Sequence, residues 1–224
     1  MISILMPIYN GIEFIEESIN SIKQQTYNNW ELIIGINGHP ENSDVFKTAK
    51  KYECENIKVY DMIHVKGKSN ALNKMLDFCK YNWVSILDVD DLWLPHKLEY
   101  QIPYIKNYDI IGTNCKYFGE SNKIPRIPLG DFSNFNFLLS NPVINSSCLI
   151  KKELCYWDSK YDSVEDYKLW LTLWSKKKLF FNIPEILTLH RIHNNSYFNT
   201  NNKQETLVKK LKDIFKDYKP NIYK

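Results

Sequence analysis

Three carboxylates stand within four residues of one another, at Asp88, Asp90 and Asp91. They follow Trp83–Leu87, an apolar run without alternation that is typical of a strand covered on both faces. Carboxylates this close repel one another, and burying them is costly without a compensating cation. Because carboxylate oxygens are hard ligands, the motif predicts Mg²⁺ or Mn²⁺ rather than zinc. The alternative is an acidic, solvated turn that caps the next helix.

A second acidic pair, Glu165 and Asp166, lies in the first turn of a helix that we expect to begin near Val164. Ser163 is the expected cap of this helix. Acidic side chains in a first helical turn stabilise the helix dipole, each by up to about 1 kcal/mol. From the residues alone, this structural role is the simplest one for the pair.

Three other polar segments adjoin predicted strands or helices. Lys66–Ser69 is a small basic turn before a helix, and His190–His193 follows an apolar run. Asn141–Ser147 brings small polar residues next to the buried run Cys148–Ile150. Each of two residues here has a purely structural alternative to a role in a site: Arg191 as a solvated charge, and His193 as a surface histidine in a polar loop.

Strands and helices alternate over the first ninety residues. Apolar runs predict strands over Ile2–Met6 (ended by Pro7), Trp30–Ile36, Ile57–Ile63 and Trp83–Leu87. The segments between them predict helices over about residues 11–25, 44–53 and 70–80. Parallel strands need crossover helices, so this alternation predicts a parallel, Rossmann-like sheet. The turns after the first, second and fourth strands then meet at one edge, where a nucleotide-sized ligand can bridge them.

The second half of the chain is less regular. We expect a helix from Pro95 to about residue 106, a strand over Ile110–Asn114, a loop over Glu120–Asp131 and a strand over Ile183–Leu189. An Asn-rich loop, 194–202, precedes an amphipathic helix over Gln204–Tyr218. We expect this helix to pack on the domain, although its lysine face also allows contact with an anionic membrane.

Composition excludes several classes of protein. A net charge of +3 on 224 residues, with the basic residues dispersed, gives no sign of a nucleic-acid partner. The five cysteines form no C-x-x-C pair and are read as reduced thiols. No run approaches the roughly 20 apolar residues of a membrane span, and no secretory signal is recognised. We therefore expect a cytoplasmic protein, peripheral to a membrane at most, whose Asn- and Lys-rich composition is typical of an AT-rich bacterial or viral genome.

Seven short motifs, in this order and spacing, resemble a family 2 glycosyltransferase of the GT-A fold, and the resemblance covers about residues 2–198. They are Met6–Asn10, Ser21–Thr26, Trp30–Ile34, Gly67–Asn73, Leu87–Asp91, Val164–Tyr167 and Arg191–His193. The resemblance implies an α/β domain with a mostly parallel sheet over residues 1–200. Residues 1–98 would be its nucleotide-binding half, 99–200 its acceptor-binding half and 201–224 a C-terminal helical segment.

The resemblance also implies an activity. Such a protein transfers a sugar, with inversion, from a nucleotide-diphosphate donor, most often UDP-linked, to a hydroxyl of a glycan, glycolipid or glycoprotein acceptor. It would use Mn²⁺ or Mg²⁺, with Asp88, Asp90 and His193 as metal ligands. Asp166 would be the catalytic base beside Glu165, and Asp91 would support the other aspartates. The implied donor-binding residues are Pro7, Ile8, Tyr9, Asn10, Asn37, Lys68, Asp88 and Arg191.

Two features depart from the family pattern. The second strand ends in Ile36 and Asn37, where family members commonly carry two aspartates that read the nucleotide base. The usual Gly-Gly-Phe segment is replaced by Cys155–Asp158. The loss at Ile36 puts recognition of the base, and so the UDP assignment, in question. It also leaves open a catalytically silent module that binds sugar nucleotides or glycans. Nucleotidyltransferases are a further alternative, but they carry a Gly-rich phosphate-binding loop after the first strand, and Pro7–Asn10 is not such a loop.

Overall fold

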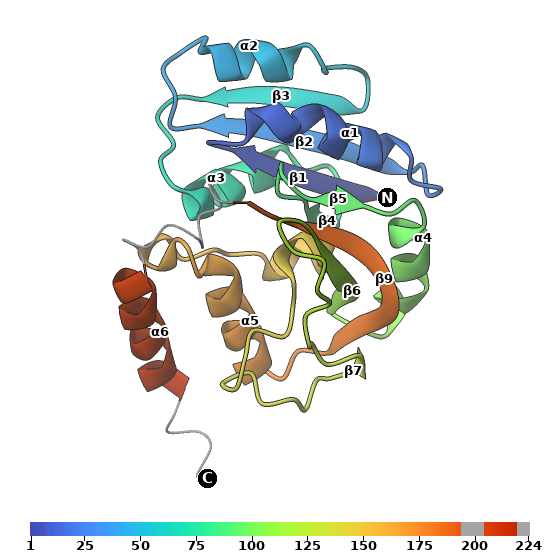
Figure 1. The fold of residues 1–224 in the computed structure, drawn as a ribbon, viewed down its shortest axis with the longest axis vertical. Helices are drawn as coiled ribbons and strands as arrows, with labels where there is room; N and C mark the ends of the chain where they lie inside the picture. The colour runs from blue at the N-terminus through green and yellow to red at the C-terminus, as the bar shows by residue number, and fades with distance from the viewer. Residues whose placement is uncertain (194–203, 219–224) are drawn as a thin grey trace.

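Parallel strands form the N-terminal half of the sheet, as their unbroken apolar runs predict. The computed structural model describes residues 1–193 and 204–218. The four strands lie in the order β3-β2-β1-β4 and pair in parallel. Their bounds are β1 Ile2–Ile8, β2 Trp30–Asn37, β3 Ile57–Met62 and β4 Trp83–Ile86. Their carboxyl ends therefore share one edge, on the left in Figure 1.

The rest of the sheet curls away from these strands in the order β8-β6-β9-β5, with β7 paired to β9. The bounds of these strands are β5 Leu92–Trp93, β6 Ile110–Gly119, β7 Gly130–Asp131, β8 Leu149–Lys151 and β9 Phe180–Ile192. The long pairing of β6 with β9 is parallel, and β8 joins β4 to β6 in antiparallel fashion. The α/β class with a mostly parallel sheet is confirmed. As Figure 1 shows, the curl of β9 returns its end to the carboxyl edge of β1 and β4.

Helices cover both faces of the sheet. Their bounds are α1 Ile15–Lys23, α2 Asp44–Lys50, α3 Lys68–Met75, α4 Lys97–Gln101, α5 Glu165–Ser175 and α6 Gln204–Tyr218. One buried cluster joins one face of the sheet to α1, α2 and α4, through residues such as Ile19, Ala49 and Leu98. The other cluster joins the opposite face to α3, α5 and α6, through residues such as Leu72 and Ile214. Burial on both faces explains why β1 and β2 carry no polar and apolar alternation.

Several predicted boundaries were wrong. β1 continues through Pro7 to Ile8, and β6 and β9 are longer than their apolar runs. The first predicted helix is divided into a 3-10 turn, Ile12–Phe14, and α1, and α3 begins two residues earlier than expected, at Lys68. Ser163 does not cap α5, because its φ is 89° and no side-chain hydrogen bond caps this helix.

The C-terminal helix packs on the domain, as its apolar face predicts. Ile214 is fully buried in the core cluster, and the ring of Phe215 meets Tyr167 edge-on at 6.0 Å. Lys210 Nζ donates to the carbonyl of Asp162. Within the described residues, no helix is long and apolar enough to cross a membrane. The Asn-rich loop predicted over 194–202 lies outside the described residues.

Candidate active site

The aspartate motif lies at the carboxyl edge of the sheet, immediately after β4. Here the turn after β1 comes close, since a Cβ on Gly11 would lie 2.9 Å from the Val89 side chain. The end of β9 also reaches this edge, where Arg191 and His193 contact Asp90. The structure thus brings together three segments that sequence motifs predicted to share a site.

Lys68 links Asp88 to the second acidic pair. Its Nζ lies 2.6 Å from Asp88 Oδ1 and 3.6 Å from Glu165 Oε1. Burial lowers the pKa of Lys68, but the charges of Asp88 and Glu165 outweigh this and raise it. Burial likewise raises the pKa of Asp88, while Lys68 and a hydrogen bond from Asn145 hold it below its ordinary value. Lys68 and Asp88 are therefore an ion pair at neutral pH.

Asp162 caps the helix α3, which begins with Lys68. Its Oδ1 accepts a hydrogen bond from the backbone N–H of Ser69, at the start of α3, over 2.9 Å. Gly67 precedes this helix with φ 85°, and a Cβ there would overlap the Asp162 carboxylate. A capping carboxylate from a distant segment explains why α3 begins earlier than the local sequence indicates.

Asp90 pairs with the end of β9. His193 Nε2 lies 3.1 Å from Asp90 Oδ2, and Arg191 Nε donates to the Asp90 carbonyl over 2.9 Å. The Arg191 guanidinium also donates to Glu17, and it is stacked between the rings of Phe14 and Phe118, at 4.4 and 4.3 Å. Through these contacts the end of β9 packs against Asp90, the 3-10 turn Ile12–Phe14 and helix α1.

Asp91 is a buried anchor beneath the motif, only 1% exposed. Its carboxylate accepts from the Arg191 backbone N–H over 2.9 Å and lies 3.0 Å from His190 Nδ1. Burial lowers the pKa of His190, but the Asp91 carboxylate outweighs this and raises it to about 9. The imidazolium therefore balances the buried carboxylate at neutral pH.

The side chains here fit a divalent metal in their chemistry. Asp90 and His193 offer a carboxylate and an imidazole side by side, and Mg²⁺ or Mn²⁺ is commonly held by one or two carboxylates together with substrate phosphates. Asp88 instead contacts Lys68 and Asn145. Among the described residues, no three His, Cys, Asp or Glu side chains converge as a preformed metal site. Phosphate oxygens would therefore have to complete the coordination.

Glu165 and Asp166 differ in their surroundings although they are adjacent. Glu165 is 5% exposed, and its Oε2 accepts from the backbone N–H of Ser163 over 2.6 Å. Asp166 is less covered, and its two oxygens accept from Tyr167 N at 2.7 Å and Asn141 Nδ2 at 3.1 Å. Burial raises the pKa of both carboxyls, against the lowering effect of Lys68.

The predicted donor-binding turn is divided between buried and exposed residues. Pro7 and Ile8 are buried inside β1, whereas Tyr9 is 57% exposed. The Tyr9 ring lies 5.2 Å from that of His39, whose Nε2 is 2.6 Å from the Tyr9 carbonyl. Asn37 is 3% exposed at the end of β2, and the preceding Ile36 is part of the core.

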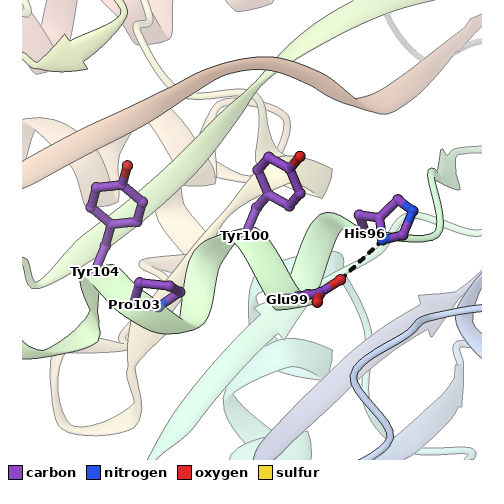
Figure 2. A pocket seen from close by; sticks show the side chains of 5 residues that line it. All are labelled: His96, Glu99, Tyr100, Pro103 and Tyr104. Atoms are coloured by element: carbon purple, nitrogen blue, oxygen red, sulfur yellow. Dashed lines mark hydrogen bonds and ion pairs between the residues drawn. The ribbon is translucent and has the colours of Figure 1, made fainter.

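A groove of about 500 Å³ lies elsewhere, along α4. Figure 2 shows its lining residues, His96, Glu99, Tyr100, Pro103 and Tyr104. Glu99 accepts from the hydroxyl of Thr26, which precedes β2. The groove is therefore at the amino-terminal edge of the strands, opposite the carboxylates.

Sequence reasoning missed several residues of this site. His39 and Asp162 carried no motif of their own. Asn141 and Asn145 belong to a segment that stood out only for its small polar residues. The contacts of Asn141 and Asp162 cross 25 and 93 residues of chain, so local sequence gave no signal for them.

Two Escherichia coli enzymes are similar to this chain in sequence. The O-antigen biosynthesis glycosyltransferase WbnJ is 31% identical over 211 residues, which cover 88% of this chain and 81% of that protein. The UDP-Glc:alpha-D-GlcNAc-diphosphoundecaprenol beta-1,3-glucosyltransferase WfgD is 26% identical over 226 residues, covering 99% of this chain and 87% of that protein.

Two solved structures share the fold. S. aureus TarS 1–349 in complex with UDP-GlcNAc aligns with a TM-score of 0.72 at 16% identity, over 89% of this chain and 60% of that one. The mannosyltransferase PcManGT from Pyrobaculum calidifontis, in complex with GDP-Man and Mn2+, aligns with a TM-score of 0.65 at 14% identity. The alignment covers 88% of this chain and 58% of that one. A profile of the family described as Glycosyl transferase family 2 matches residues 3–152. The chain belongs to glycosyltransferase family 2.

Proposed function

We propose that this glycosyltransferase moves a sugar, with inversion and with the help of a divalent metal, from a UDP-sugar to a hydroxyl of a glycan, glycolipid or glycoprotein acceptor. One observation carries the proposal. Lys68 contacts both Asp88, on the donor side, and Glu165, the neighbour of the proposed base Asp166. Donor carboxylates and base thus belong to one charged cluster at the edge where α/β proteins bind nucleotides.

Asp166 is the proposed general base. As the acceptor oxygen attacks the anomeric carbon of the donor, Asp166 takes the hydroxyl proton and the bond from that carbon to the diphosphate breaks. Attack from the face opposite the leaving group inverts the configuration. Burial raises the pKa of Asp166 toward the working pH, which suits a general base, and such a base contributes about 10²–10⁴-fold to the rate.

Asp90 and His193 are the proposed protein ligands of the metal, with Asp88 beside them. When bound, the metal would offset the negative charge that grows on the departing diphosphate. Lys68 holds Asp88, and we propose that this carboxylate borders the ribose of the donor. We also propose that Tyr9, Asn10 and Asn37 border the nucleotide. Pro7 and Ile8 are buried, so their contribution would come through the backbone.

The neighbours and relatives support a donor and an acceptor class. TarS structures hold UDP and UDP-GlcNAc, and WfgD is named for a UDP-Glc donor and a diphosphoundecaprenol-linked acceptor. WbnJ and the Erwinia amylovora protein AmsE are named for polysaccharide biosynthesis. We therefore propose a cytoplasmic enzyme that extends a lipid-linked glycan. The exposed Lys209, Lys212 and Lys216 of α6 are suited to peripheral contact with an anionic membrane.

A thermal-shift panel of UDP, GDP, CDP and dTDP, each with and without Mn²⁺, tests the donor class. A ligand that binds only the folded state raises the melting temperature. We expect UDP with Mn²⁺ to raise it by several degrees and the other nucleotides to raise it less. A larger response to GDP would contradict the UDP assignment. If no nucleotide raised the melting temperature but glycans added in the same assay did, the result would favour the silent binding module suggested by Ile36.

A further inference from the structure

The segment 141–147 contacts the proposed site in two places, at the proposed base and at the donor-side carboxylate. At one end, Asn141 Nδ2 donates to Asp166 Oδ2 over 3.1 Å. At the other end, Asn145 Nδ2 lies 3.2 Å from Asp88 Oδ2, and the Ser146 hydroxyl accepts from the Asp88 backbone N–H over 3.1 Å. A single short stretch of chain therefore contacts both the proposed base and the donor-side carboxylate.

Buried side chains from three other elements hold this segment in place. Asn182 on β9 is fully buried and donates to the Pro142 carbonyl over 2.9 Å. Trp93 Nε1 donates to the Ser146 carbonyl over 2.6 Å, and Gln101 Nε2 donates to the Ser147 carbonyl over 2.9 Å. Ser146 and Ser147 are themselves 0% exposed. A backbone held at several points can fix the spacing of the groups attached to it.

We propose that Asn141 is a positioning residue for Asp166, carried on a segment that sets the base relative to Asp88. The inference rests on the proposed function of Asp166 as general base. Asp166 Oδ1 accepts from Tyr167 N and Oδ2 from Asn141, so two donors on different elements fix the rotation of the carboxylate. Each oxygen keeps a lone pair for the acceptor proton.

The Asn141 amide also favours the ionised form of Asp166. Burial raises the pKa of this carboxyl, and the hydrogen bond from Asn141 acts in the opposite direction. Removing the donor should therefore raise the pKa of Asp166. A base must be ionised to accept a proton, so the acid limb of the pH–rate profile should move to higher pH.

A structural role is the competing explanation, because Asn141 Oδ1 accepts from Val143 N over 3.3 Å within its own loop. Asn141→Asp separates the two roles. The aspartate keeps an oxygen for Val143 N, but it replaces the amide donor with a second carboxylate facing Asp166. Asn141→Ala removes both interactions. Asn134→Ala, at an exposed asparagine on the preceding stretch of chain, is the matched control.

Steady-state transfer by the full chain, measured across pH, tests the proposal. We expect kcat to fall roughly 10-fold to 100-fold in both Asn141 variants, as for other misplaced catalytic groups, with the donor KM within about twofold of wild type. The acid limb should move to higher pH, further for Asn141→Asp than for Asn141→Ala. Wild-type kcat and pH profile in Asn141→Asp would overturn the proposal, and Asn134→Ala should match wild type in both.

A second measurement needs no turnover. The carboxyl ¹³C resonance of Asp166, assigned by its loss in Asp166→Asn, is titrated in wild type and in Asn141→Asp. A higher pKa of Asp166 in Asn141→Asp supports the positioning role, and an unchanged pKa overturns it. A wild-type protein that transferred no sugar would contradict the proposed function, while this titration would still decide the role of Asn141.

Discussion

At the scale of single residues, the site consists of buried and half-buried charges that neutralise one another. Lys68 balances Asp88 and Glu165, and His190 balances Asp91. A buried charge that loses its partner is strongly destabilised, so these pairs hold the proposed ligands in place before any substrate binds. Asp90 is different. Burial and the neighbouring Asp91 raise its pKa, and a cation bound beside it would lower this pKa.

Asp90→Asn tests the proposed metal ligand. The amide keeps the shape of the side chain but loses the charge that attracts a divalent cation. We expect calorimetry to show UDP affinity that no longer depends on Mn²⁺, while affinity without metal is unchanged. Asp44→Asn, at a fully exposed carboxylate, is the control and should bind as wild type. Metal-dependent UDP binding of wild-type strength in Asp90→Asn would exclude Asp90 as a ligand.

His190 predicts how stability depends on pH. Its folded pKa of about 9 lies above the ordinary histidine pKa of 6.5. A raised pKa contributes stability that is fully present below pH 6.5 and is lost as pH rises through about 9. His190→Gln should therefore flatten the fall in melting temperature between pH 6.5 and 9.5. If the melting temperatures of the variant and the wild type changed with pH in parallel, the His190–Asp91 pair would make no pH-dependent contribution to stability.

At the scale of elements, the start of α3 depends on a contact from far along the chain. Gly67→Ala places a Cβ against the Asp162 carboxylate and keeps the residue at positive φ. Gly130→Ala is the matched control, because Gly130 also has positive φ but open space around it. Positive φ strains an alanine at both positions, and Gly67, with ψ 150°, has a backbone conformation that is essentially restricted to glycine. We expect Gly67→Ala to lose more stability than Gly130→Ala in urea unfolding, and equal losses would contradict the close contact.

The elements themselves were largely predictable. Strand and helix order through β4 follows from apolar runs and helical spacing, because local sequence decides both. The ends of elements were less predictable. α3 begins where Asp162 caps it, and β9 extends to Ile192 because β6 pairs with it along most of its length. Partners distant in sequence decide such boundaries, and a single sequence does not display them.

At the scale of the whole molecule, α6 completes the core on one face of the sheet. Ile214 is fully buried in that core, whereas Val208 on the same helix is 48% exposed. We expect Ile214→Ala to lower the free energy of unfolding by about 2–5 kcal/mol in one cooperative transition, while Val208→Ala changes little. A separate early transition in wild type, or a neutral Ile214→Ala, would show that α6 is not part of the cooperative unit.

The site was predictable in its charged residues and less so in their arrangement. The motifs indicated Asp88 and Asp90, because clustered carboxylates suit a divalent metal, whereas the roles of Asp166 and His193 were implied only by the resemblance to the family. They did not indicate that Lys68 would lie between Asp88 and Glu165, or that Arg191 would stack between Phe14 and Phe118. Those contacts depend on the curl of β9 and on the packing of α5, which are properties of the whole fold.

The most direct test of the central claim is the transfer rate of Asp166→Asn measured together with its UDP affinity. Asparagine keeps the size of the side chain but accepts no proton, so we expect kcat to fall about 10²–10⁴-fold while UDP binds as in wild type. Asp158→Asn, at a carboxylate that caps a 3-10 turn and would keep a capping oxygen as asparagine, is the control for folding. A wild-type transfer rate in Asp166→Asn would remove Asp166 as the base and contradict the account.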